Sequence, residues 1–92
     1  MGEKQIEQRL KREVEKRGGL ALKFTPPGWA GAPDRIVLMP GGHVAFVELK
    51  APGGRVRPLQ WKRIDELRAM GFHVAVINSV DGVDDFIEEW LA

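Results

Sequence analysis

Apolar residues first recur along this chain at the spacing of a helix. Ile6, Leu10 and Val14 lie four residues apart in an otherwise charged segment, which predicts an amphipathic helix over residues 3–17. Two glycines follow directly, and glycine readily adopts the left-handed conformation that ends many helices. We therefore expect the first helix to end at Gly18.

The pattern then changes to that of strands. Residues 20–24, with the sequence LALKF, place a large apolar residue at every second position, as in a half-buried strand. The proline- and glycine-rich segment 25–33 predicts an irregular loop that leads directly to Asp34. Residues 35–39 and 44–49 are apolar on both faces, which is typical of central strands covered by helices on both sides.

The second half of the chain predicts a helix, a strand and a further helix. Pro58 suits the first turn of a helix over residues 58–70, and residues 72–78 have the pattern of a strand that should run parallel to a neighbour. The inner face of the first of these helices is predicted to contain Gln60, Trp61, Ile64 and Leu67. The terminal helix has apolar residues at helical spacing, namely Val83, Phe86, Ile87, Trp90 and Leu91. The expected fold is α/β, with an αβββαβ core, a mixed four-stranded sheet flanked by helices, and a C-terminal helix.

Composition limits the broad class of the protein. The 92 residues, 43% of them hydrophobic and 29% charged, suit one globular domain spanning residues 1–92. No apolar run approaches the roughly 20 residues of a membrane span, and the N-terminus is too polar for a secretory signal. Without cysteine the chain cannot form disulfides or zinc–thiolate sites. We expect an intracellular, cytoplasmic protein of a bacterial or viral host cell.

Three charged residues interrupt the two central apolar strands. Glu48 and Lys50 alternate along their strand, so that they share one face. Whether Asp34 joins them depends on the loop between the strands. A two-residue turn places Asp34 opposite Leu49 on the other face, whereas a three-residue loop brings it to the face of the other two charges. A shared site therefore requires a loop of odd length, or a bulge that corrects the register.

Two carboxylates that converge at one end of a sheet repel each other unless a cation lies between them. The oxygen ligands of Asp34 and Glu48, in a chain without cysteine, favour a hard ion such as Mg²⁺, for which Mn²⁺ is a substitute. Such an ion can hold a phosphate oxygen and favour in-line attack by water. The alternative for Glu48 and Lys50 alone is a solvated ion pair at an exposed strand end.

Five segments, taken in order, resemble the stand-alone virus-type replication-repair nuclease (VRR-NUC) domain of the PD-(D/E)XK nuclease superfamily: EKQIEQRL, RGGLALKF, GAPDRIVL, VAFVELKAPGG and RPLQ. The match covers nearly the whole chain, and the expected order of elements is similar to the restriction-endonuclease-like core of that superfamily. The resemblance implies divalent-metal-dependent hydrolysis of phosphodiester bonds. Small members resemble Holliday junction resolvases, which implies a structure-selective endonuclease that acts on branched DNA as a homodimer.

The resemblance also assigns expected roles to individual residues. Asp34 and Glu48 match the metal-binding acids, and Lys50 matches the catalytic lysine. The backbone carbonyl of Leu49 matches a position that usually adds a main-chain metal ligand. Gln60 matches the family's glutamine, which could hydrogen-bond Lys50 or a water on the metal, or else cap its own helix.

A glutamate on the first helix belongs to the same pattern, and Glu3 and Glu7 both qualify. We favour Glu3, because it precedes the apolar residue Ile6 by three positions and so lies at the start of the sheet-facing stripe. Glu7 lies on the flank of that stripe. The alternative for either residue is a solvated helix acid.

Contacts with nucleic acid are predicted for Trp29, Arg55, Arg57 and Lys62. Trp29 could stack on a base, or it could pack against the first helix. A net charge of +1 indicates no general attraction to nucleic acid, so the basic residues matter because their segment follows Lys50 directly. Otherwise they form a solvated face.

Two alternatives to a junction-cleaving enzyme stay open. The same site could serve a nickase, a flap nuclease or an exonuclease. The chain could also be a catalytically silent nucleic-acid-binding subunit that keeps the fold. The intact set of Asp34, Glu48 and Lys50 argues against the silent subunit.

Overall fold

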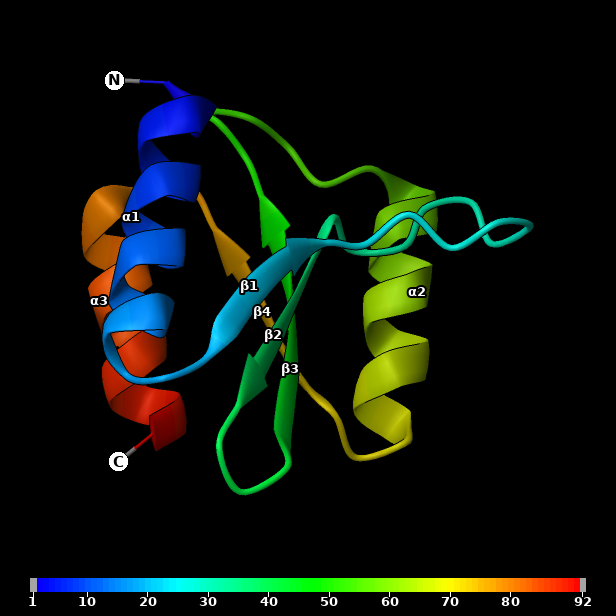
Figure 1. Cartoon of the computed structure of the whole chain (residues 1–92). Coiled ribbons are helices and arrows are strands. Elements are labelled where there is room, and N and C mark those ends of the chain that lie inside the picture. The colour runs from blue at the N-terminus through cyan, green and yellow to red at the C-terminus, as the bar shows by residue number, and fades with distance from the viewer. Residues whose placement is uncertain (1, 92) are drawn as a thin grey trace.

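The computed structural model describes residues 2–91. In chain order the elements are α1 (Glu3–Lys16), β1 (Leu20–Lys23), β2 (Arg35–Met39), β3 (His43–Leu49), α2 (Pro58–Ala69), β4 (His73–Ile77) and α3 (Val80–Leu91). The strands form one four-stranded sheet in the order β1-β2-β3-β4. Helices α1 and α3 cover one face of this sheet and α2 covers the other (Figure 1). The predicted α/β architecture is confirmed.

Strand directions follow the predicted mixed topology. β2 runs antiparallel to both β1 and β3, whereas β3 and β4 are parallel because α2 crosses over between them. Met39 pairs with His43, which leaves a three-residue loop between β2 and β3. The required odd loop length is therefore confirmed, and it sets the face on which Asp34 lies.

The end of α1 is built as the glycine pair predicts. Gly18 has a φ of 84°, in the left-handed region. The amide of Gly18 donates to the carbonyl of Glu15, and the amide of Gly19 donates to that of Val14, each at 3.0 Å. This pair of bonds satisfies helix-terminal carbonyls and turns the chain into β1.

Two apolar cores lie on opposite faces of the sheet. The larger core joins α1 and α3 to the sheet through buried residues that include Ile6, Leu10, Val14, Val37, Val47, Leu49 and Phe86. The smaller core joins α2 to the sheet through Phe46, Ile64, Leu67 and Val74. Successive residues of β3 contribute to both cores, which is why β3 is apolar on both faces.

Two burial predictions were wrong. Leu20 and Leu22 are 50% and 44% exposed, because they lie on the α2 face of the sheet while α2 itself packs over the β4 side. Trp61 is 43% exposed. The buried residues of α2 are Gln60, Ile64 and Leu67. Trp61 follows Gln60 by one residue, which is a rotation of about 100° around the helix axis, so its side chain points away from the inner face.

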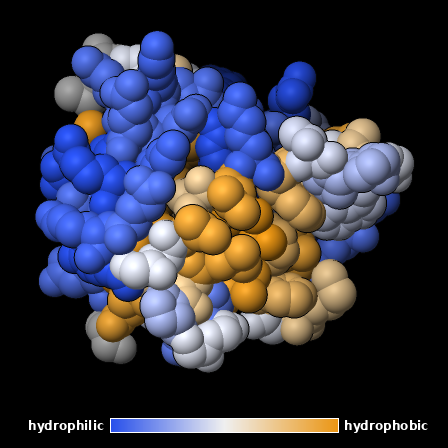
Figure 2. All heavy atoms as spheres, in the orientation of Figure 1, coloured by the Kyte–Doolittle hydropathy of each residue, from blue (hydrophilic) through white to orange (hydrophobic). Residues whose placement is uncertain are grey.

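The part of the sheet that α2 leaves uncovered forms an open apolar face. We define this open sheet face by its part-exposed or exposed residues Leu20, Leu22, Leu38, Val44 and Phe72. Figure 2 shows it as a continuous hydrophobic surface at the centre of the molecule. Within residues 2–91, no helix has both the length and the apolar character needed to cross a membrane.

Candidate active site

Asp34 directly precedes β2 and is held from two sides. Its backbone carbonyl accepts the amide of Phe24 at 2.9 Å. Its carboxylate accepts the amide of Leu49 through both oxygens, at 3.3 and 3.4 Å. Extending the β2–β3 register by one pair sets Asp34 opposite Glu48, with both side chains on the α2 face. The structure therefore brings the two predicted acids together at the end of β3.

Glu48 is almost completely buried, with an exposed fraction of 2%. Its Oε2 accepts a hydrogen bond from Nε2 of Gln60 at 2.8 Å and lies 3.2 Å from Nζ of Lys50. Its Oε1 is buried and has no hydrogen-bond partner among the described residues. A buried carboxylate oxygen without a partner is costly, and a cation at that oxygen would remove the cost.

The environment of Asp34 also favours a cation. Burial, and secondly the nearby charge of Glu48, raise the pKa of Asp34 to about 6. The Leu49 amide and the Arg35 guanidinium oppose this rise without cancelling it. Near neutral pH the two acids are thus held close together at an energetic cost, which a divalent ion would offset.

Gln60 connects the site to the start of α2. Its Nε2 donates to Glu48, and its Oε1 accepts the backbone amide of Arg57 at 2.8 Å. The predicted hydrogen bond to Lys50 is wrong, because the buried carboxylate of Glu48 lies between them and accepts from both. The alternative cap role is also present, so one side chain fixes the helix start and orients Glu48.

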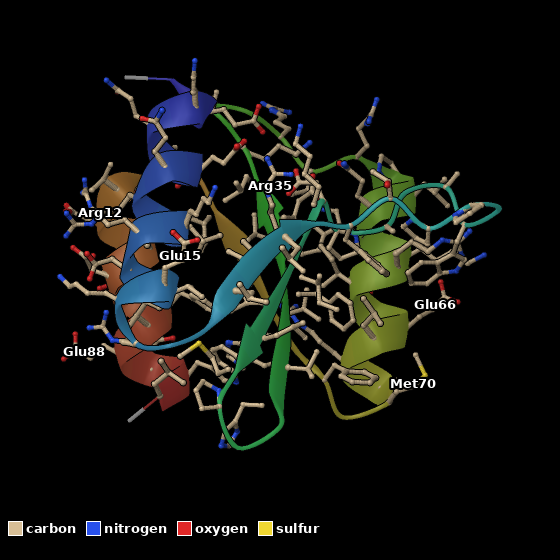
Figure 3. The ribbon with its side chains drawn as sticks, in the orientation of Figure 1. Arg12, Glu15, Arg35, Glu66, Met70 and Glu88 are labelled. Atoms are coloured by element: carbon tan, nitrogen blue, oxygen red, sulfur yellow. The ribbon has the colours of Figure 1, made fainter. Side chains whose placement is uncertain are left out.

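The two glutamates of α1 have different surroundings. Glu7 forms an ion pair with Arg35, whose Nη1 also donates to the carbonyl of Asp34 at 3.0 Å. Figure 3 shows Arg35 toward the upper end of the sheet. Glu3 is exposed at the start of α1, and its charge contributes to the raised pKa of Asp34. The role of Arg35 was missed, and its place beside Asp34 was the only signal in the sequence.

Trp29 packs against α2 rather than α1. It is half-buried against the smaller core, and the guanidinium of Arg63 lies 5.1 Å from the centre of its ring. The predicted packing against the first helix was wrong, because the loop before Asp34 crosses to the α2 side of the sheet (Figure 1). The exposed residues Arg55 and Arg57 lie in the segment that joins β3 to α2, and exposed Lys62 lies within α2.

The described residues offer a sparse set of metal ligands. Within residues 2–91, no three histidine, cysteine or acidic side chains form a cluster that could hold a metal ion. Two carboxylates would need further oxygen ligands, which suits Mg²⁺ because this ion keeps several waters. Extending the register also sets Pro33 opposite Leu49, and proline has no N–H to donate to the Leu49 carbonyl. That carbonyl is thus a chemically suitable further ligand.

Comparison with known proteins agrees with this geometry. The model of the VRR-NUC domain family matches residues 5–81. The chain belongs to the VRR-NUC family. The resemblance carried by the five sequence segments is therefore confirmed, and with it the restriction-endonuclease-like fold.

Individual relatives of this VRR-NUC domain support the assignment. The chain is 47% identical over 79 residues to "Putative nuclease p44" of Acyrthosiphon pisum secondary endosymbiont phage 1, a match that covers 86% of this chain and 85% of that protein. A solved structure described as "VRR_NUC domain" superposes with a TM-score of 0.88 at 34% identity, covering 96% of both chains. This VRR-NUC domain is thus a nuclease, and its substrate is a nucleic acid.

Proposed function

We propose that this nuclease is a divalent-metal-dependent DNA endonuclease that cleaves branched DNA, as a Holliday junction resolvase does. The observation that carries the proposal is the pairing of buried Glu48 with part-buried Asp34. Oε1 of Glu48 has no hydrogen-bond partner among the described residues, and the carboxyl of Asp34 has a raised pKa. Both features are expected of a site built to hold a cation. A bound Mg²⁺ supplies positive charge that polarises the phosphate and favours attack by water.

The residues of the chain divide the remaining work. Asp34 and Glu48 supply negative oxygens for the ion, and the Leu49 carbonyl is available beside them. Lys50, whose ammonium lies 3.2 Å from Oε2 of Glu48, reaches the same space with a positive charge. That charge can stabilise the phosphate as negative charge develops during cleavage. Gln60 holds Glu48 in position, and Glu3 at the start of α1 is the outer acid, whose charge acts on Asp34.

A homodimer is the second part of the proposal. The open sheet face is apolar, and its residues Leu20 and Leu22 are 50% and 44% exposed. Exposed apolar patches of this kind mark interaction surfaces in soluble proteins. A two-fold pairing of this face would give two sites, as incision of both opposed strands of a four-way junction requires.

A substrate panel tests the proposal. Purified protein is incubated with labelled four-way junction, flap, single-stranded and linear duplex DNA, and with matching RNA, with Mg²⁺, with Mn²⁺ or with a chelator. We expect metal-dependent cleavage of the junction above all other substrates. Preferred cleavage of a flap, of a single strand of duplex, or from free ends would instead support a flap nuclease, a nickase or an exonuclease. Binding without cleavage of any substrate would support a silent subunit.

A further inference from the structure

The loop that carries the chain into Asp34 is fastened to α2. This loop, residues 25–33, has no regular structure, yet three of its residues contact the helix. Trp29 packs on the smaller core beside α2, and the carbonyl of Ala30 accepts Nε of Arg63 at 2.8 Å. Gly31 approaches Leu59 so closely that an added Cβ would lie 2.7 Å from its Cγ.

Arg63 is the centre of this attachment. Its guanidinium also lies over the ring of Trp29 and donates from Nη1 to Glu66 at 2.8 Å. Glu66 lies on the outer side of α2 (Figure 3), and this ion pair helps to orient the guanidinium that contacts the loop. The Arg63 side chain is only 18% exposed, so its charge is held between the loop and the helix.

One short stretch of α2 is therefore linked to both acids of the proposed site, directly to Glu48 and through the loop to Asp34. Gln60, in the first turn, holds Glu48 through its Nε2. Arg63, three residues further on, holds the loop whose last residue precedes Asp34. Residues three apart on a helix lie on neighbouring positions of its surface, so the spacing of the two acids is set by one rigid element.

We propose that Arg63 is a positioning residue, which keeps Asp34 beside Glu48 by fastening the 25–33 loop to α2. This inference rests on the proposed function, since it assigns Arg63 to the geometry of that site. A displacement of about 1 Å in a reacting group can cost roughly 100-fold in rate. Release of the loop should therefore lower the rate of cleavage without weakening the binding of DNA.

Two variants and one matched control test the role of Arg63. Arg63→Ala removes the attachment from the helix side. Gly31→Ala disturbs it from the loop side without changing any charge, because the Cβ meets Leu59 and the residue has a φ of +83°. Arg68→Ala is the control, since Arg68 also lies on α2 and donates to a backbone carbonyl, that of Val74 at 2.9 Å.

Two readouts separate positioning from a general effect on stability or charge. The first is the steady-state cleavage of junction DNA, for which we expect kcat to fall roughly 10- to 100-fold in Arg63→Ala and Gly31→Ala with KM for DNA unchanged. The second is the ¹H–¹⁵N resonance of the Leu49 amide in the metal-free protein. This amide donates to Asp34, so its chemical shift and its exchange rate should change in both variants and not in Arg68→Ala.

The outcomes distinguish this inference from the proposed function. A rise in the KM for DNA with unchanged kcat would identify Arg63 as a phosphate contact and overturn the positioning role. An unmoved Leu49 resonance in folded Arg63→Ala and Gly31→Ala would overturn it as well. If the unaltered protein cleaves no substrate, the proposed function fails, while the Leu49 resonance still reports whether Arg63 positions Asp34.

Discussion

Replacing Asp34 by asparagine should make the metal-free protein more stable while it removes the activity. Asparagine keeps an oxygen that can accept the Leu49 amide, and it removes the charge that opposes Glu48. The pKa of Asp34 rises from an ordinary 3.8 to about 6 on folding. The folded protein therefore binds this proton more tightly than the unfolded chain does, so that the free energy of unfolding falls as pH rises between these two values.

The size of the effect follows from the shift. One pKa unit corresponds to about 1.4 kcal/mol, and solvent screening reduces the total because Asp34 is only part-buried. We expect Asp34→Asn to gain about 1 to 2 kcal/mol above pH 7, which is roughly 5 to 10 °C in Tm for a domain of this size. Near pH 3.5 the gain should become small, because the aspartate is then protonated in the folded protein and mostly protonated in the unfolded chain.

Thermal unfolding followed by circular dichroism, from pH 3.5 to pH 8 in the presence of a chelator, measures this gain. Asp84→Asn is a suitable control, because Asp84 on α3 pairs with Arg9 on α1, and both helices cover the face of the sheet opposite to that of the two acids. A loss of stability in Asp34→Asn at pH 8, or a gain that does not depend on pH, would show that Asp34 and Glu48 do not repel each other in the folded protein.

Three further predictions concern Gln60, the open sheet face and the two glutamates of α1. Gln60→Leu removes the hydrogen bonds that Gln60 makes to buried Glu48 and to the Arg57 amide at the start of α2. Urea unfolding should therefore show a loss of about 1 to 3 kcal/mol, and cleavage should slow roughly 10- to 100-fold; unchanged stability would contradict the contacts of Gln60. Leu22→Lys places a charge on the open sheet face, so light scattering should report a folded monomer in place of a dimer. A dimer that persists in this variant would exclude the open sheet face as the dimer interface. Glu3→Gln should lower cleavage more than Glu7→Gln does, since Glu7 is paired with Arg35; the reverse order in the same cleavage assay would make Glu7 the outer acid.

Much of the fold could be predicted from the sequence because its signals are local. The four-residue spacing of Ile6, Leu10 and Val14 and the glycine pair after them define α1 and its end. The face on which Asp34 lies could be predicted from the loop between β2 and β3. Strand side chains alternate strictly, so an odd or even loop length decides the face.

The failures have a common cause, which is that burial depends on neighbours that are distant in the sequence. Alternation correctly indicated a strand at Leu20 and Leu22, but it could not show that α2 is placed over the other half of the sheet. Trp61 is apolar and adjacent to the inner face of α2, yet a rotation of one residue exposes it.

The contacts that shape the site were equally hidden in the sequence. Two arginines hold the segment around Asp34 by donating to its backbone carbonyls. Arg35 donates to the carbonyl of Asp34, and Arg63 donates to the carbonyl of Ala30. Bonds from a side chain to a backbone carbonyl leave no periodic pattern, whether the carbonyl is adjacent in the chain, as for Arg35, or distant, as for Arg63. The catalytic residues could be proposed from motifs, whereas the residues that position them required coordinates.

In the proposed mechanism, Asp34 and Glu48 together hold the metal ion that cleavage requires. The most direct measurement is the rate of junction cleavage as a function of Mg²⁺ concentration for the unaltered protein, Asp34→Asn, Glu48→Gln and the control Asp84→Asn. We predict saturable metal-dependent cleavage for the unaltered protein and the control, and a loss of at least about 100-fold for each of the two site variants. Undiminished cleavage by Asp34→Asn and Glu48→Gln, or full activity in a chelator, would show that these two acids do not hold a metal ion that cleavage requires.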